Sequence, residues 1–128
     1  MKSFCCILLL VASTAFAGWF RIADWDSYPG ARAKGECMIY AKAVCNDLQS
    51  RKIVCHEVRY RWVKGEQKGN HAVVLFRYSG EWFIVENERT EPVKGTRYVT
   101  ATGDWSEAGM LKAIKFVDRN ATEIYLVN

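Results

Sequence analysis

The chain has 128 residues, half of them hydrophobic and a quarter charged, with a formal net charge of +4. This length suits one compact domain, and the many aromatic residues and only two prolines exclude a disordered or low-complexity protein. The weak positive charge does not indicate a nucleic-acid binder, because such proteins usually concentrate their basic residues in a strong patch.

The first 17 residues have the features of a secretory signal peptide. Lys2 gives a positive start, residues 4–12 are almost wholly apolar, and residues 15–17 (Ala-Phe-Ala) form a small-x-small cleavage site. Cleavage would leave residues 18–128 as a single domain. Because the apolar run is shorter than the ~18 residues of a membrane span, we expect an exported protein, periplasmic or extracellular, without stable membrane insertion. An uncleaved anchor is the alternative.

A helix is predicted after an irregular lead-in of residues 18–34. Apolar side chains form one stripe from Cys37 through Ala41 and Val44 to Leu48, with the spacing of a helical face. This pattern predicts a helix that carries Cys37 at its start and ends near residue 50.

Antiparallel strands are predicted next. Residues 53–63 alternate between an apolar face and a polar face that includes Cys55 and Glu57, as in a half-buried strand. Residues 64–70 are predicted to form a polar loop. The apolar runs 71–78 and 81–86 are typical of central strands in a covered sheet, and Ser79-Gly80 between them is typical of a tight hairpin turn.

The C-terminal part gives a weaker pattern. Residues 97–100 and 123–127 favour strands, residues 105–110 favour a helical turn, and residues 113–117 are ambiguous. One helix followed by an antiparallel sheet indicates an α+β fold.

The mature chain keeps three cysteines, Cys37, Cys45 and Cys55. An odd number in an exported protein suggests one disulfide and one free thiol. Cys37 and Cys45 would lie ~12 Å apart along one helix, beyond the ~7 Å that a disulfide spans between Cα atoms. We therefore predict a Cys45–Cys55 disulfide, with two reduced core cysteines as the alternative. A zinc site is not expected, because no C-x-x-C spacing is present.

Cys37 would stand at the start of the helix, behind Gly35 and Glu36. Unpaired amide hydrogens and the positive end of the helix dipole favour a thiolate there, and Gly35 lets a substrate approach the backbone closely. The structural alternative is a small buried residue of the helix stripe.

A histidine and an acid are predicted to share one face of the hairpin. With Ser79-Gly80 as the turn, Leu75 pairs with Ile84, and Glu86 lies diagonal to His71 on the same face. Asn87 then points to the other face, and Glu88 shares the face of His71 beyond the strand end. A one-residue slip of register would exchange Glu86 for Asn87, so Asn87 and Glu88 stay alternative partners of His71.

Three segments together resemble the transglutaminase-like cysteine proteinases, and in particular the small exported bacterial branch of that papain-like superfamily. They are GECMIYAKAV at residues 35–44, the strand that begins with His71, and WFIVENER at residues 82–89. Glu86-Asn87 stands where the family has Asp-Asn. The chain departs from the family at Glu36, which replaces an aspartate, and at Met38, which replaces an acidic residue.

The resemblance implies a papain-like or transglutaminase-like core, in which the helix with Cys37 packs on the sheet that carries His71 and the acid. Cys37 would attack an acyl carbon, His71 would hold the thiolate and protonate the leaving group, and Glu86 would orient the imidazole. The amide of Cys37 would help to bind the oxyanion, with Gly35, Glu36 and Asn87 near the site.

The implied substrate is a protein or peptide, including a cell-wall peptide, and neither a cofactor nor a metal is implied. The acyl-enzyme could react with water or with an amine, and the sequence leaves this choice open. Nucleic acid is not expected as a partner. Arg59 and Arg61 lie on one solvated face of the predicted strand, and the apolar residues that alternate with them lie on the other face. The departures from the family pattern support a second hypothesis, a catalytically degenerate module that binds a protein or cell-wall partner.

Overall fold

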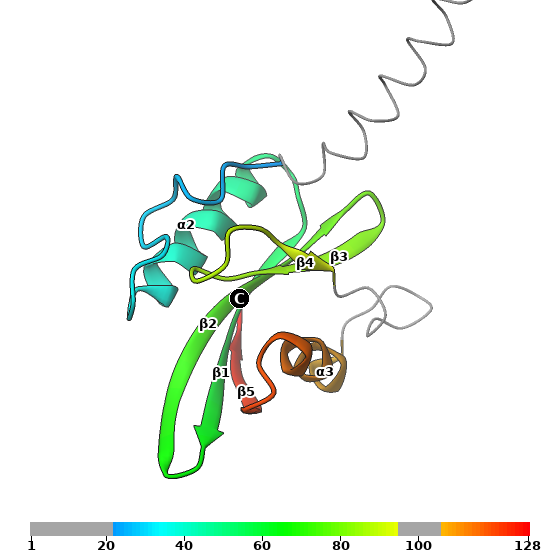
Figure 1. Cartoon of the computed structure of the whole chain (residues 1–128). Helices are drawn as coiled ribbons and strands as arrows, with labels where there is room; N and C mark the ends of the chain where they lie inside the picture. The colour runs from blue at the N-terminus through cyan, green and yellow to red at the C-terminus, as the bar shows by residue number, and fades with distance from the viewer. Residues whose placement is uncertain (1–21, 95–105) are drawn as a thin grey trace, which may run out of the picture.

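A computed structural model describes residues 22–94 and 106–128. These residues form two helices and a five-stranded antiparallel sheet, so the predicted α+β fold class is confirmed (Figure 1). The helices are α2 (Cys37–Ser50) and α3 (Glu107–Val117). In spatial order the strands are β4 (Val93–Lys94), β3 (Glu81–Val85), β2 (Gln67–Tyr78), β1 (Cys55–Lys64) and β5 (Ala121–Val127). Within the described ranges, neither helix is long and apolar enough to cross a membrane.

Helix α2 has the predicted bounds and carries Cys37 as its first residue. Its buried stripe packs on β2 and β1 and consists of Tyr40, Ala41, Val44, Cys45 and Leu48. A disulfide joins Cys45 to Cys55, with 6.1 Å between their Cα atoms, whereas Cys37 is free. The predicted pairing is therefore confirmed, and a disulfide is consistent with an exported protein.

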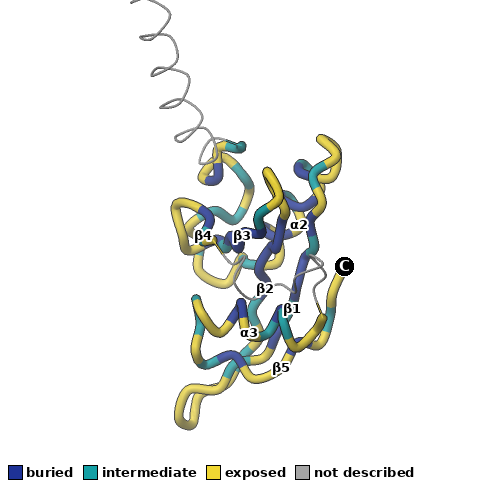
Figure 2. The backbone as a smooth tube through the Cα atoms, turned by 90° about the vertical axis from the view of Figure 1, so that its right-hand side faces the viewer, coloured by how far each residue is buried: buried dark blue, intermediate teal, exposed yellow. Residues whose placement is uncertain are grey.

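The sheet separates two hydrophobic clusters because successive side chains of a strand point to opposite faces. Ala72, Val74 and Phe76 of β2 pack in the cluster beside α2, whereas Val73 and Leu75 pack in the cluster beside α3. Figure 2 shows that the buried residues concentrate along the middle of the sheet. Central strands covered on both faces explain why β2 and β3 are apolar at consecutive positions.

The hairpin of β2 and β3 has the predicted register. Tyr78 pairs with Glu81 and Leu75 pairs with Ile84 around the turn at Ser79-Gly80. Ser79 adopts φ +54° and Gly80 φ +78°, as a two-residue turn with two left-handed positions requires. This register determines which side chains of the two strands share a face.

Two local predictions are wrong for β1 and β2. Glu57 of the predicted polar face is buried rather than solvated, and it pairs with Arg59 at 2.8 Å. Residues 64–70 are mostly strand, since β1 runs to Lys64 and β2 starts at Gln67 after a turn at residues 65–66. The side chains of this hairpin end are largely exposed, so polar residues there do not indicate a loop. As a result His71 lies opposite Tyr60 within β2 and does not open the strand.

The C-terminal region is more regular than its sequence pattern indicates. Ser106 caps α3 by accepting a hydrogen bond from the Gly109 amide at 3.0 Å, and the helix includes the ambiguous residues 113–117. Strand β5 confirms the prediction for residues 123–127 and starts two residues earlier. The predicted strand at residues 97–100 lies outside the described residues.

Candidate functional site

The imidazole of His71 and the carboxylate of Glu86 form the centre of the candidate site. His71 comes from β2 and Glu86 follows the last residue of β3, and the Nε2 and Oε2 atoms lie 2.9 Å apart. Both side chains are mostly buried, with 17% and 13% of their surfaces exposed. A neutral imidazole that donates from Nε2 presents Nδ1 as its lone-pair acceptor. Glu86 thus orients the ring in the way that a general base requires.

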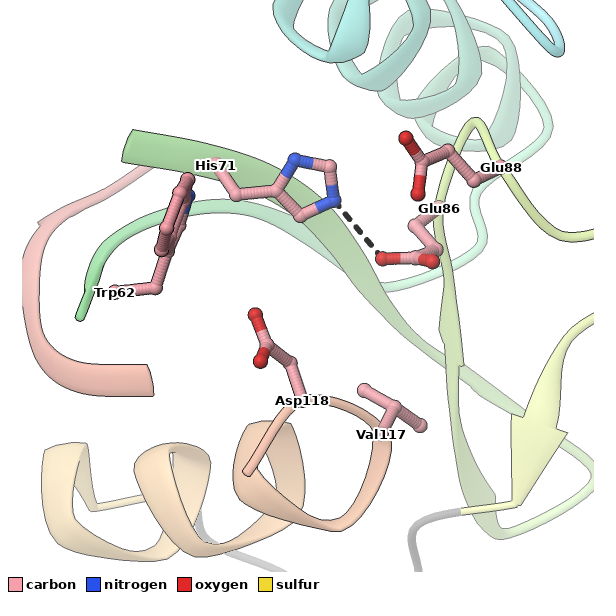
Figure 3. A pocket seen from close by; sticks show the side chains of 6 residues that line it. All are labelled: Trp62, His71, Glu86, Glu88, Val117 and Asp118. Carbon is pink, nitrogen blue, oxygen red and sulfur yellow. Dashed lines mark hydrogen bonds and ion pairs between the residues drawn. The ribbon is translucent and has the colours of Figure 1, made fainter. Parts of the chain in front are cut away.

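A cavity of about 310 Å³ opens beside this pair. Figure 3 shows the six side chains that line it: Trp62, His71, Glu86, Glu88, Val117 and Asp118. Three of them are carboxylates, so the cavity is acidic although the chain as a whole is basic. Val117 and Asp118 come from the end of α3, and no motif in the sequence connects them with His71.

The Trp62 indole packs closely against Gly69 of β2. A Cβ atom added at Gly69 would lie 2.7 Å from the Trp62 ring, so this close packing requires glycine. One wall of the cavity therefore depends on a cross-strand pair, since Trp62 of β1 faces Gly69 of β2.

Tyr60 supports the site from within the sheet. Its ring packs edge-on against the His71 ring with 5.7 Å between centroids, and its hydroxyl donates to Asp118 at 2.8 Å. Burial raises the pKa of Tyr60 most, followed by the hydrogen bond to Asp118 and the negative charges of Asp118, Glu86 and Cys37. The phenol consequently stays neutral and holds the Asp118 carboxylate in place.

Cys37 is half-buried and packs against the cluster beside α2. It is not one of the cavity's six lining residues, and across the described ranges no hydrogen bond joins its sulfur to His71. The structure therefore brings His71 and Glu86 into contact on the face of the sheet that Val73 and Leu75 share, whereas Cys37 packs in the cluster beside α2 on the opposite face.

The residues expected near the site occupy two different places. Gly35 and Glu36 are exposed just before α2, and Gly35 adopts φ +81°. Asn87 is buried and turned away from the cavity, because its side chain donates to the carbonyl oxygens of Ala33 and Gly30. Glu88 is exposed and lines the cavity.

The first turn of α2 leaves backbone amides without a side-chain cap. Glu36 at the N-cap position makes no side-chain hydrogen bond to the helix, and the first turn contains no acidic residue. Such amides, together with the positive end of the helix dipole, attract an anion. Cys37 thus lies where a developing oxyanion can be stabilised.

In the described part of the chain, no group of three or more histidine, cysteine or acidic side chains is arranged to hold a metal ion. No protein-family model matches the chain. No curated protein and no solved structure matches it either. The family of the chain thus remains a resemblance of motifs, and the function has to be inferred from the site itself.

Proposed function

We propose that the chain is an exported, thiol-dependent hydrolase or acyltransferase with a transglutaminase-like core, acting on peptide or amide bonds in the periplasm or outside the cell. The observation that carries the proposal is the 2.9 Å hydrogen bond between His71 and Glu86 at an open cavity. A free cysteine at the start of the adjacent helix supplies the nucleophile.

In the proposed reaction the Cys37 thiolate attacks the acyl carbon of the substrate. The imidazole of His71 takes the thiol proton and later gives it to the leaving amine, which breaks the amide bond and leaves a thioester on Cys37. Glu86 orients the ring and stabilises the imidazolium. Water or a second amine then attacks the thioester and releases the thiol.

The amides at the start of α2 stabilise the oxyanion of the tetrahedral intermediate. Cys37 and His71 are not in hydrogen-bond contact in the free protein, but catalytic hydrogen bonds often tighten only when the substrate binds. A substrate in the acidic cavity would lie against His71 and would have to reach the sulfur from there. The mechanism therefore requires closure of the gap between Cys37 and His71.

The test is the rate at which a thiol-reactive probe labels Cys37 across the pH range in the purified mature protein. We expect the labelling rate of Cys37 to reach half of its maximum at a pH well below about 8.5, the value for a free thiol. His71→Ala should remove this advantage, and His56→Ala is the matched control because His56 stacks on Trp82 away from the cavity. A wild-type midpoint at the free-thiol value would contradict the proposal.

One observation favours a second candidate function: Cys37 does not line the cavity. An acidic cavity that needs no nucleophile would suit a catalytically degenerate module that binds a protein or cell-wall partner. In that case Cys37→Ala leaves partner binding and phenotype unchanged, whereas Asp118→Asn weakens binding. Loss of function in Cys37→Ala would count against this second candidate.

A further inference from the structure

We infer that Asn87 is a positioning residue, which fixes the start of α2, and with it Cys37, relative to the hydrogen-bonded pair of His71 and Glu86. The inference rests on the proposed function, because it concerns the same nucleophile and the same base. It gives Asn87 a role in geometry and no contact with the substrate.

Asn87 and Glu86 are neighbours that point to opposite sides. β3 ends at Val85 and Asn87 lies in the turn that follows, so Glu86 reaches His71 while Asn87 turns toward the lead-in before α2. Asn87 is only 2% exposed. The two ends of this dipeptide thus contact the two parts of the site that the reaction must bring together.

Three hydrogen bonds join Asn87 to the lead-in. Its Nδ2 atom donates to the carbonyl oxygen of Ala33 at 2.8 Å and to that of Gly30 at 3.3 Å. The backbone carbonyl oxygen of Asn87 accepts a hydrogen bond from the backbone amide of Arg32 at 2.7 Å. One buried residue therefore holds both ends and the middle of residues 30–33.

Residues 30–33 in turn determine where α2 begins. The carbonyl oxygen of Ala33 also accepts from the amide of Glu36, the N-cap residue, at 3.2 Å. Gly30 adopts φ +83°, and a Cβ atom there would lie 2.8 Å from the Glu36 carbonyl oxygen and 3.1 Å from the Tyr40 amide. Because the loop is in such close contact with the first turn, a shift of residues 30–33 also moves Cys37.

A second anchor of the same lead-in provides the control. The Tyr28 hydroxyl donates to Asp47, near the last turn of α2, far along the helix from Cys37. If Asn87 merely stabilised the fold, loss of either anchor would have similar effects on Cys37. If Asn87 positions the nucleophile, only its loss should change the chemistry of the sulfur.

The experiment measures the rate at which iodoacetamide labels Cys37 across pH in the wild type and in Asn87→Ala, Asn87→Ser and Tyr28→Phe. Retention of the Cys45–Cys55 disulfide and cooperative unfolding identify the folded variants. We expect both Asn87 variants to move the labelling midpoint to the free-thiol value of about 8.5 and to slow labelling near pH 6 by roughly tenfold or more. Tyr28→Phe should keep the wild-type midpoint.

The outcomes separate this inference from the proposed function. An unchanged midpoint in either folded Asn87 variant overturns the positioning role, as does an equal shift in Tyr28→Phe. A wild-type midpoint at the free-thiol value overturns the proposed function, and with it the positioning role, before any variant is compared. Asn87→Ser decides the result if Asn87→Ala does not fold, since it keeps a polar group at the buried position.

Discussion

The Nε2 atom of His71 lies 2.9 Å from the Oε2 atom of Glu86, across two strands joined by a two-residue turn. Fifteen residues separate the two in sequence, yet the short hairpin makes their contact a local consequence of register. The contact is therefore specified by the register of one hairpin.

Replacement of the acid should weaken the base. Glu86→Gln keeps the size of the side chain but removes the charge that orients and stabilises the imidazolium, so we expect turnover of a cleaved peptide substrate to fall by roughly 10²- to 10⁴-fold. Glu88→Gln is the matched control, because Glu88 lines the same cavity without a hydrogen bond to His71 in the described structure. Equal losses in both variants would show that only the charge of the cavity matters.

Removal of the Cys45–Cys55 disulfide should reduce stability without displacing Cys37. Cys45→Ala combined with Cys55→Ala should lower the free energy of unfolding by about 2–3 kcal/mol, because the disulfide closes a short loop. Denaturant unfolding measures this change. Cys37→Ser, the control, should cost under about 1 kcal/mol, since Cys37 is free and half-buried. A larger loss in Cys37→Ser than in the double variant would contradict the assignment.

Stability should fall at high pH because of the buried tyrosines. Burial and the Asp118 hydrogen bond raise the pKa of Tyr60 above its usual value of 10.0. Above pH 10 the unfolded chain loses this proton while the folded chain keeps it, so stability decreases by up to about 1.4 kcal/mol per pH unit. Below pH 10 the phenol contributes no pH dependence.

The pKa values of Tyr28 and Tyr40 are raised as well, so Tyr60→Phe should flatten the alkaline slope without abolishing it. Denaturant unfolding at several pH values above neutral, in a Cys37→Ser background that prevents thiol exchange, measures the slope. An identical slope in Tyr60→Phe and its parent would be incompatible with the proposed protonation state.

The wall of the cavity should be sensitive to Gly69. Gly69→Ala places a Cβ atom 2.7 Å from the Trp62 ring, so the indole has to move. Because the ring is at the end of a side chain near a solvent-exposed hairpin, we expect a loss in stability of about 1 kcal/mol, the low end of the cost of overpacking, together with a shift in tryptophan emission. The Trp62→Phe background should remove the emission shift, and its persistence there would assign it to another tryptophan.

The sequence predicts the parts of the site that are local. Helix α2 and the β2–β3 register follow from the stripe through Val44 and from the turn at Ser79-Gly80, because each depends on residues close together in the chain. The hydrogen bond between His71 and Glu86 agrees with the predicted shared face. The catalytic roles of these residues stay predictions.

The remaining parts depend on tertiary packing. Asp118 meets the site only because the end of α3 lies where the Tyr60 hydroxyl of β1 can donate to it, and no local pattern indicates this position. Glu57 is buried against Arg59 and Asn128, which follows β5, on a strand face whose alternation indicates solvent. Helix α3 itself had a usable signal, since Ser106 is a good N-cap residue and apolar residues follow at Met110, Ala113 and Ile114 with helical spacing.

The placement of the three cysteines implies an order of events during oxidation. Cys37, Cys45 and Cys55 allow three alternative pairings, and two of these would consume Cys37. Once α2 has formed, ~12 Å of helix separates Cys37 from Cys45, whereas Cys55 is held 6.1 Å from Cys45 between Cα atoms. A helix that folds before the thiols are oxidised thus keeps the proposed nucleophile away from Cys45 and favours the Cys45–Cys55 disulfide.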